Sequence, residues 1–254
     1  NKIDNNLCEI DRFMINYLID KKIYIYNVNP HIAWSPVNYQ SDIVDDRKEL
    51  YDILDEKYAE FARDVFESWM ISNPYARGPN WAVTMEPAMR IFTWTWLFHV
   101  FQGAAAWSDQ RFRTRFLACL YEHGAFCARY LEDFGINGNH LTADASALVF
   151  SAEFFPKSVE TRKWGDQGWH LLVSEIFKQV HDDGVDFEGS VSYHRMVAEL
   201  FLWPARYRKI KDKGVPELYY ERLRKMASFS AAYSGSNGVA PLWGDADDGR
   251  PFIL

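Results

Sequence analysis

The stretch NHLTADASALVFSAEFFP, residues 139–156, constrains the fold more than any other part of the sequence. Small and apolar side chains fill most of its positions, and its few polar residues form no continuous polar face. A helix that is apolar on all sides is typical of the interior of a large helical protein. The stretch therefore predicts a buried inner helix, which Pro156 ends because proline has no backbone donor.

Further helices are predicted on both sides of this inner helix. Residues 86–107 are again apolar almost all round, residues 45–70 and 109–133 are amphipathic, and three more helices are expected at residues 158–180, 190–209 and 216–233. Short connections favour antiparallel neighbours. The alternation of apolar and amphipathic helices predicts an all-α fold with an inner and an outer layer, as in an α/α toroid. A plain helical bundle fits the same pattern.

Composition excludes several classes of protein. Hydrophobic residues make up 48% of the chain and aromatic residues 17%, which excludes intrinsic disorder. The net charge of −7 argues against a nucleic-acid binder, because phosphate neutralisation needs clustered Lys and Arg. The longest apolar run, residues 91–107, contains His99 and Gln102, so we interpret it as a buried helix rather than a membrane span.

The sequence predicts no metal, cofactor or disulfide framework within this chain. Cys119 and Cys127 fall in one predicted helix, where their Cα atoms would lie about 12 Å apart, beyond the roughly 7 Å limit for a disulfide. No His-x-x-x-His pair and no Cys-x-x-Cys motif occurs, which argues against zinc. The acidic run at residues 245–249 places its glycine too early for a calcium loop.

Polar residues gather at three predicted loop-to-helix junctions. The first contains Asn80, Trp81, Glu86 and Arg90, the second is Gly138-Asn139-His140, and the third runs from Asp186 to Arg195 through Glu188, Tyr193 and His194. A helix N-terminus presents free amide donors and the positive end of the helix dipole. The three junctions are therefore candidates for binding an anionic ligand.

These motifs, taken in their order and spacing, resemble the heparinase II/III-like polysaccharide lyases. The resemblance spans about residues 69–250 and is carried by Gly138-Asn139-His140, Phe154-Phe155-Pro156, Asp183-Gly184, Glu188-Gly189-Ser190, Tyr193-His194 and the run GDADDGR at residues 244–250, with Asn80-Trp81, Glu86, Arg90 and Trp94 upstream. Some members carry a glutamate three residues after the histidine of the Asn-His pair. Ala143 stands there in this chain, which favours the heparinase III-like branch.

The resemblance implies a domain organisation and a compartment. Residues 1–44 would be an N-terminal segment, residues 45–234 an incomplete α/α toroid that forms the catalytic domain, and residues 235–254 a Gly/Asp-rich loop. That loop would lead toward an antiparallel β-sandwich that is absent from this chain and that often holds a metal in the family. Members of the family are usually exported, so we expect a periplasmic or secreted protein with no membrane insertion.

The resemblance also implies the reaction, which is β-elimination on a uronate-containing acidic polysaccharide. Asn139 would hydrogen-bond the uronate carboxylate and stabilise the enolate-like charge. Tyr193 would act as base, acid or both. An unperturbed phenol has a pKa near 10, so a basic role needs nearby positive charge. The predicted catalytic residues are Asn139, His140, Tyr193 and His194, and the predicted substrate-binding residues are Asn80, Trp81, Arg90, Glu188 and Arg195.

Each of these residues also has a structural interpretation. Asn139 would be a good helix N-cap, and His140, Tyr193 and His194 could be structural neighbours. Glu188 could accept hydrogen bonds from loop amides, Arg90 could pair with Glu86 four residues earlier, and Trp81 could fill the core rather than stack on a sugar.

Two other functions fit the sequence. One is a toroidal glycoside hydrolase that uses Glu188 with Asp144 or Asp186 as a pair of carboxylates. The other is a non-catalytic glycan-binding domain, which the aromatic content allows. The identity of the glycan and the oligomeric state are left open by the sequence.

Overall fold

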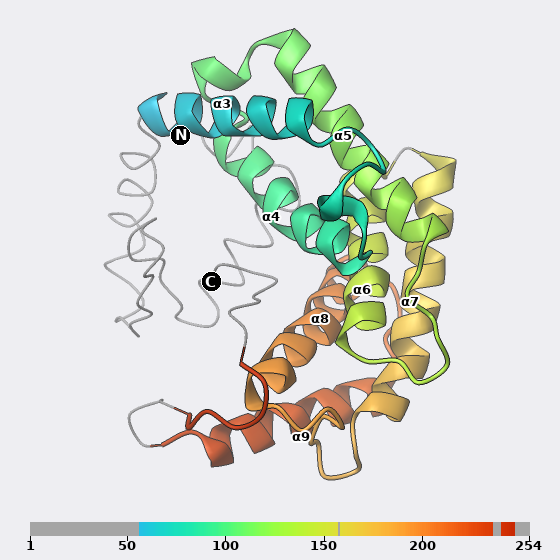
Figure 1. Cartoon of the computed structure of the whole chain (residues 1–254). Coiled ribbons are helices and arrows are strands. Elements are labelled where there is room, and N and C mark those ends of the chain that lie inside the picture. The colour runs from blue at the N-terminus through green and yellow to red at the C-terminus, as the bar shows by residue number, and fades with distance from the viewer. Residues whose placement is uncertain (1–55, 157, 236–239, 247–254) are drawn as a thin grey trace, which may run out of the picture. The chain divides into compact units, whose positions relative to one another are not determined.

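The computed structural model describes residues 56–156, 158–235 and 240–246, and its regular secondary structure in these ranges is helical (Figure 1). The helices are α3 (Glu56–Ser72), α4 (Met85–Phe101), α5 (Gln110–Arg129), α6 (Asn139–Phe154), α7 (Val159–Gln179), α8 (Val191–Ile210) and α9 (Glu217–Tyr233), with short 3-10 helices η1 (Pro79–Trp81) and η2 (Ala105–Trp107). The described part contains a single β-bridge, between Val180 and Asp186, and no strand. The all-α prediction is therefore confirmed.

Two predicted helices end earlier in the structure. The helix predicted at residues 109–133 is α5, which ends at Arg129. The helix predicted at residues 86–107 is α4, which ends at Phe101 because a turn with Gly103 leads into η2. The start of the helix predicted at residues 45–70 lies outside the described residues. No described helix is long and apolar enough to cross a membrane.

Internal contacts divide the chain into two compact units. The described residues of the first unit are 56–74 and 93–120, and those of the second are 75–92, 121–156, 158–235 and 240–246. The organisation of residues 45–234 as one catalytic domain stays a prediction.

The first unit has an aromatic core. The ring of Phe66 in α3 contacts Trp94, Trp107 and Phe116 edge-on, with centroids 4.8, 5.8 and 5.0 Å away. Trp107 is completely buried, and its indole Nε1–H donates to the carbonyl of Ala59 at 3.0 Å. Large rings in such T-shaped pairs stabilise a core beyond the area they bury, which accounts for part of the aromatic excess.

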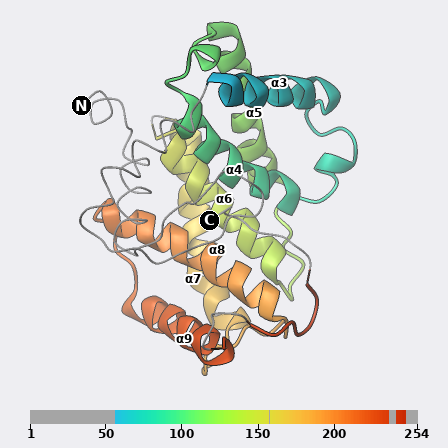
Figure 2. The same ribbon diagram turned by 90° about the vertical axis from the view of Figure 1, so that its left-hand side faces the viewer.

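The second unit is built around α6, as the sequence predicts for an inner helix. Thirteen of the sixteen residues of α6 are buried, and the helix contacts both α7 and α8. The last helix, α9, contacts both α8 and α7 (Figure 1, Figure 2). The core cluster joins residues of all four helices: Ala145, Val149, Leu172, Ile176, Val180, Val197, Phe201, Ala205, Tyr219, Leu223 and Met226.

Two glycines of α7 allow α6 and α7 to approach closely. A Cβ atom at Gly168 would lie 2.3 Å from the carbonyl oxygen of Ala145, and one at Gly165 would lie 2.5 Å from the Cβ of Ala152. Both contacts are far shorter than van der Waals distance. At Gly168 the backbones of α6 and α7 therefore meet directly, and at Gly165 the Ala152 methyl group of α6 packs against the α7 backbone.

We expect Gly168→Ala to destabilise the second unit by about 1–3 kcal/mol, because the added methyl group meets backbone that cannot rotate away. Hydrogen exchange of peptides from α6 and α7, together with thermal unfolding, measures the effect. Gly214→Ala is the matched control, since Gly214 is exposed and has open space around its Cβ position. Equal protection in the two variants would contradict the close packing.

Candidate active site

Glu188 joins the second and third predicted junctions. Its carboxylate accepts hydrogen bonds from both the backbone N–H and the side-chain Nδ2–H of Asn139, each at 2.6 Å. Asn139 is the first residue of α6, and the preceding Gly138 is its N-cap with no side-chain cap. The alternative interpretation of Asn139 as the N-cap is therefore wrong, because Asn139 lies one residue inside the helix, where its side-chain Nδ2–H donates to a carboxylate 49 positions later.

Gly138 makes room for this contact. A Cβ atom at Gly138 would lie 2.6 Å from Oε1 of Glu188 and 3.0 Å from its Cδ. Any other residue would push the carboxylate away from Asn139. Gly138 and Asn139 of the second junction and Glu188 of the third junction thus form one contact, called here the Asn139–Glu188 contact.

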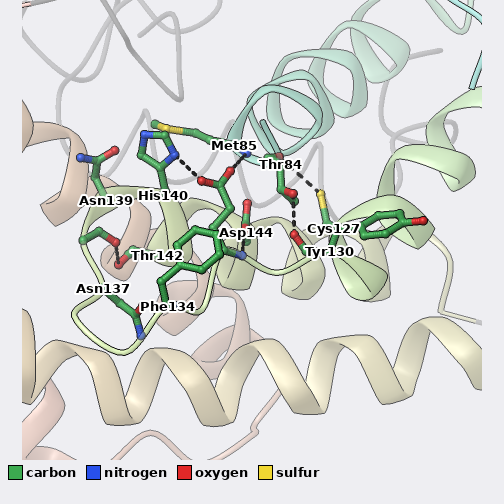
Figure 3. Close-up of polar contacts among 12 residues, drawn as sticks. Thr84, Met85, Cys127, Tyr130, Phe134, Asn137, Asn139, His140, Thr142 and Asp144 are labelled. Carbon is green, nitrogen blue, oxygen red and sulfur yellow. Dashed lines mark hydrogen bonds and ion pairs between the residues drawn. The ribbon is translucent and has the colours of Figure 1, made fainter. Parts of the chain in front are cut away.

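Glu132 joins the first and second junctions. Its Oε1 accepts the backbone N–H of Met85 at the start of α4 at 3.0 Å, and its Oε2 lies 2.7 Å from Nδ1 of His140 in α6 (Figure 3). Sequence reasoning missed Glu132, because it lies in the polar loop after α5, where a glutamate is unremarkable. Only the long-range contact identifies it.

The third junction is capped locally and then covered by a later segment. Oγ of Ser190, the N-cap of α8, accepts from the backbone N–H of Tyr193 at 3.2 Å and donates to the carbonyl of Asp245 at 2.5 Å. The N–H of Val191 donates to the carbonyl of Trp243 at 3.1 Å. Residues 243–245 therefore lie against the first turn of α8, which carries Tyr193.

Gly244 permits this close approach. Its φ of 75° favours glycine, and a Cβ there would lie 2.8 Å from the carbonyl oxygen of Gly189. Tyr193 is half-buried and Arg195 is exposed on the same helix. The structure thus brings Tyr193 and Asn139 to helix starts that are linked through the loop of Glu188, and it leaves the chemical role of both as a prediction.

His194 lies in the interior, with 2% of its surface exposed. Its Nδ1 accepts from the backbone N–H of Asp186 at 3.3 Å, and its Nε2 lies 3.1 Å from the carbonyl of Met226, which can only accept. The ring is therefore the Nε2–H tautomer, and burial lowers its pKa. These contacts match the structural interpretation of His194, which fastens the third junction to α9.

Arg90 has the ion pair that the sequence left as an alternative. Its Nη1 lies 3.5 Å from Glu86, its Nε donates to Nε2 of His123 at 2.9 Å, and its Nη2 donates to the carbonyl of the half-buried Asn80. The guanidinium also lies 5.5 Å from the ring of Trp81. Arg90 thereby holds the first junction together.

Trp81 fills the core, which is the second of its two predicted roles. The residue is 4% exposed, and its ring contacts Tyr75, His123 and Phe126 at centroid distances of 5.3, 4.6 and 5.2 Å. Stacking on a sugar would need an open ring face. A substrate contact of Trp81 remains a prediction that this position does not favour.

Two buried aspartates lie behind the site. Burial raises the pKa of Asp144 to about 8 and that of Asp186 to about 7. Asp144 accepts the backbone N–H of Glu132 at 2.9 Å, and Asp186 accepts that of Glu188 at 3.0 Å. Each aspartate thus holds the backbone of one of the two linking glutamates. The described residues contain no group of three or more His, Cys, Asp or Glu placed to hold a metal ion.

We expect Gly138→Ala to loosen the Asn139–Glu188 contact without unfolding the protein, because the atom displaced is the end of a side chain. The lost hydrogen bonds should cost about 1–3 kcal/mol, visible as faster hydrogen exchange at the start of α6. Gly103→Ala, where a Cβ meets nothing within 4 Å, is the control. Unchanged hydrogen exchange at Asn139 would contradict the role of Gly138 in the Asn139–Glu188 contact.

We also expect Asp144 to contribute a loss of stability as the pH rises from about 4 to about 8. An aspartate in the unfolded chain loses its proton near pH 4, whereas folded Asp144 keeps its proton up to about pH 8. The folded state therefore binds more protons in this window, and stability decreases as the pH rises. Asp144→Asn should remove this contribution from the dependence of the melting temperature on pH, and the contribution of Asp186 should remain. An unchanged slope would refute this.

Comparison with known proteins places this arrangement in a family. Residues 47–251 match the family model described as "Heparinase II/III N-terminus". A heparin-sulfate lyase of Bacteroides thetaiotaomicron is 28% identical over 207 residues, covering 76% of this chain and 29% of the relative. A heparin-sulfate lyase of Pedobacter heparinus is 25% identical over 199 residues, with the same coverage of both chains.

The fold is likewise similar to that of a solved relative. A crystal structure of heparinase III superposes with a TM-score of 0.62 and 20% identity, over 93% of this chain and 40% of that one. This likeness supports the predicted α/α toroid. The chain spans about three-tenths of the length of the curated relatives named above. The family model covers most of the chain, and the chain therefore belongs to the heparinase II/III family, whose N-terminal region it matches.

Proposed function

We propose that the protein that carries this chain is a polysaccharide lyase that cleaves a uronate-containing acidic glycan by β-elimination and leaves an unsaturated uronate end. The observation that carries the proposal is the link through Glu188 between Asn139 and the loop that leads to Tyr193. Its relatives in two organisms are heparin-sulfate lyases, which favours a glycosaminoglycan as the substrate. Such a polymer also favours an exported enzyme.

Asn139 would stabilise the charge that develops on the substrate. One N–H of its amide donates to Glu188, which fixes the plane of the amide group. The second N–H of Nδ2 would donate to the uronate carboxylate and lower the cost of the enolate-like state. Glu188 is itself an anion and already accepts two hydrogen bonds, so we assign it the role of orienting Asn139 rather than binding the uronate.

Tyr193 would move the proton. As a phenolate it would take the proton from the carbon next to the carboxylate, and as a phenol it would return a proton to the leaving glycosidic oxygen while the carbon–carbon double bond forms. A phenolate in the first turn of α8 is favoured by the positive end of the helix dipole, and the exposed Arg195 adds a positive charge on the same helix.

The hydrolase alternative has less support. Asp144 is 0% exposed and Asp186 is 1% exposed, and both accept backbone hydrogen bonds behind the site. A carboxylate that acts on a glycosidic oxygen must reach the substrate. Neither aspartate is placed to pair with Glu188 in that reaction.

The test incubates the protein that carries this chain with a panel of uronate polysaccharides that includes heparan sulfate. The ultraviolet absorbance of the conjugated unsaturated uronate should rise with at least one polymer. New reducing ends without that absorbance would mean hydrolysis. Binding without either product would support a glycan-binding domain instead.

We expect Tyr193→Phe to lower kcat by about 10²–10⁴-fold, the usual contribution of a proton-transferring group, with little change in KM. Tyr121→Phe is the matched control, because the Tyr121 hydroxyl donates to Glu160 at 2.6 Å on an exposed surface of the same unit. Full turnover in Tyr193→Phe would exclude the tyrosine mechanism.

A further inference from the structure

Glu132 has the contacts of a residue built to orient a neighbour. Only 14% of its side chain is exposed, and both carboxylate oxygens are engaged, one by the backbone N–H of Met85 at 3.0 Å and the other by Nδ1 of His140 at 2.7 Å (Figure 3). An exposed ion pair contributes little and is easily lost. A carboxylate held at both oxygens has one orientation.

The loop that carries Glu132 is fixed as well. The hydroxyl of Thr84 donates to the carbonyl of Tyr130 at 2.5 Å, and the N–H of Glu132 donates to the buried Asp144 at 2.9 Å. Farther along, Oδ1 of Asn137 accepts the N–H of Phe134 at 2.9 Å, which closes the loop on itself (Figure 3). The position of Glu132 is therefore set by α4, α6 and the loop together.

These contacts determine which nitrogen of His140 carries the proton. The backbone N–H of Met85 can only donate, and a carboxylate has only acceptors. Nδ1 of His140 must therefore carry a hydrogen to bond to Glu132. In the neutral ring Nε2 then keeps its lone pair. The His140 side chain is 48% exposed, so this lone pair lies on an accessible ring next to Asn139.

We propose that Glu132 is a positioning residue that holds His140 in the Nδ1–H tautomer, so that Nε2 accepts the proton that the Tyr193 hydroxyl gives up when the reactive phenolate forms. The inference rests on the proposed function for its catalytic part. Its structural part, the tautomer of His140, can be tested without any substrate.

The isosteric variant Glu132→Gln tests which nitrogen of His140 carries the proton. Its side chain has one oxygen and one amide nitrogen. The oxygen must face the N–H of Met85, so the NH₂ group would face Nδ1 of His140 and require an acceptor there. The histidine should switch to the Nε2–H tautomer and lose its accessible acceptor. We expect kcat to fall by about 10²-fold or more, with a small change in KM.

Solid-state ¹⁵N NMR of the histidine-labelled protein that carries this chain, at a pH where the ring is neutral, reads the tautomer directly. His140→Gln identifies the signals of His140. The unsubstituted protein should give the Nδ1–H pattern, and Glu132→Gln the Nε2–H pattern. Glu153→Gln is the matched control, because Glu153 is similarly buried and pairs with Lys213 at 2.8 Å elsewhere in the unit.

The outcomes separate the two parts of the inference. An Nε2–H pattern in the unsubstituted protein, or an unchanged pattern in Glu132→Gln, would overturn the assignment whatever the activity. A switched tautomer with unchanged kcat would overturn the positioning role. If the protein shows no elimination on any glycan, the proposed function fails while the NMR result still decides the tautomer.

Discussion

The paired hydrogen bonds between Asn139 and Glu188 are the contact on which the rest of the site depends. A helix normally satisfies its first amide donors with a side chain at its own N-cap. Here the N-cap is a glycine, and the acceptor comes from a loop 49 residues later. The backbone donor of Asn139 at the start of α6 is therefore satisfied by the loop before α8, which ties this helix end to the assembled site.

Tight packing of α6 holds Asn139 in place for its contact with Glu188. The helix is buried along most of its length, and Gly165 and Gly168 bring the backbone of α7 against it. The Ser190 cap of α8 and two buried aspartates then hold the loops at its N-terminal end, with Asp144 bonded to Glu132 and Asp186 bonded to Glu188. The side chains of Glu132 and Glu188 are therefore attached to backbone that has little freedom to move.

Local sequence signals predicted the helices of the second unit well, because they are strong there. The bounds of α6 to α9 differ from the predicted ones by about one residue, and Ser158 and Ser190, predicted as the first residues of two helices, are the N-caps of α7 and α8. The site was only partly predictable. Asn139 and Tyr193 stand in recognisable motifs, whereas the part played by Glu132 and the burial of Trp81 follow from partners far away in sequence, which no local pattern encodes.

The loop between α5 and α6 divides into a constrained half and a permissive half. Backbone groups of Tyr130 and Glu132 are bonded to α4 and α6, so an added residue there would move the glutamate off both partners. Phe134 and Ile136, by contrast, are 81% and 90% exposed. The side chains at these two positions are therefore free to vary among related chains, and a label on the side chain at residue 136 would report on the site from outside while the hydrogen bond between Phe134 and Asn137 stays in place.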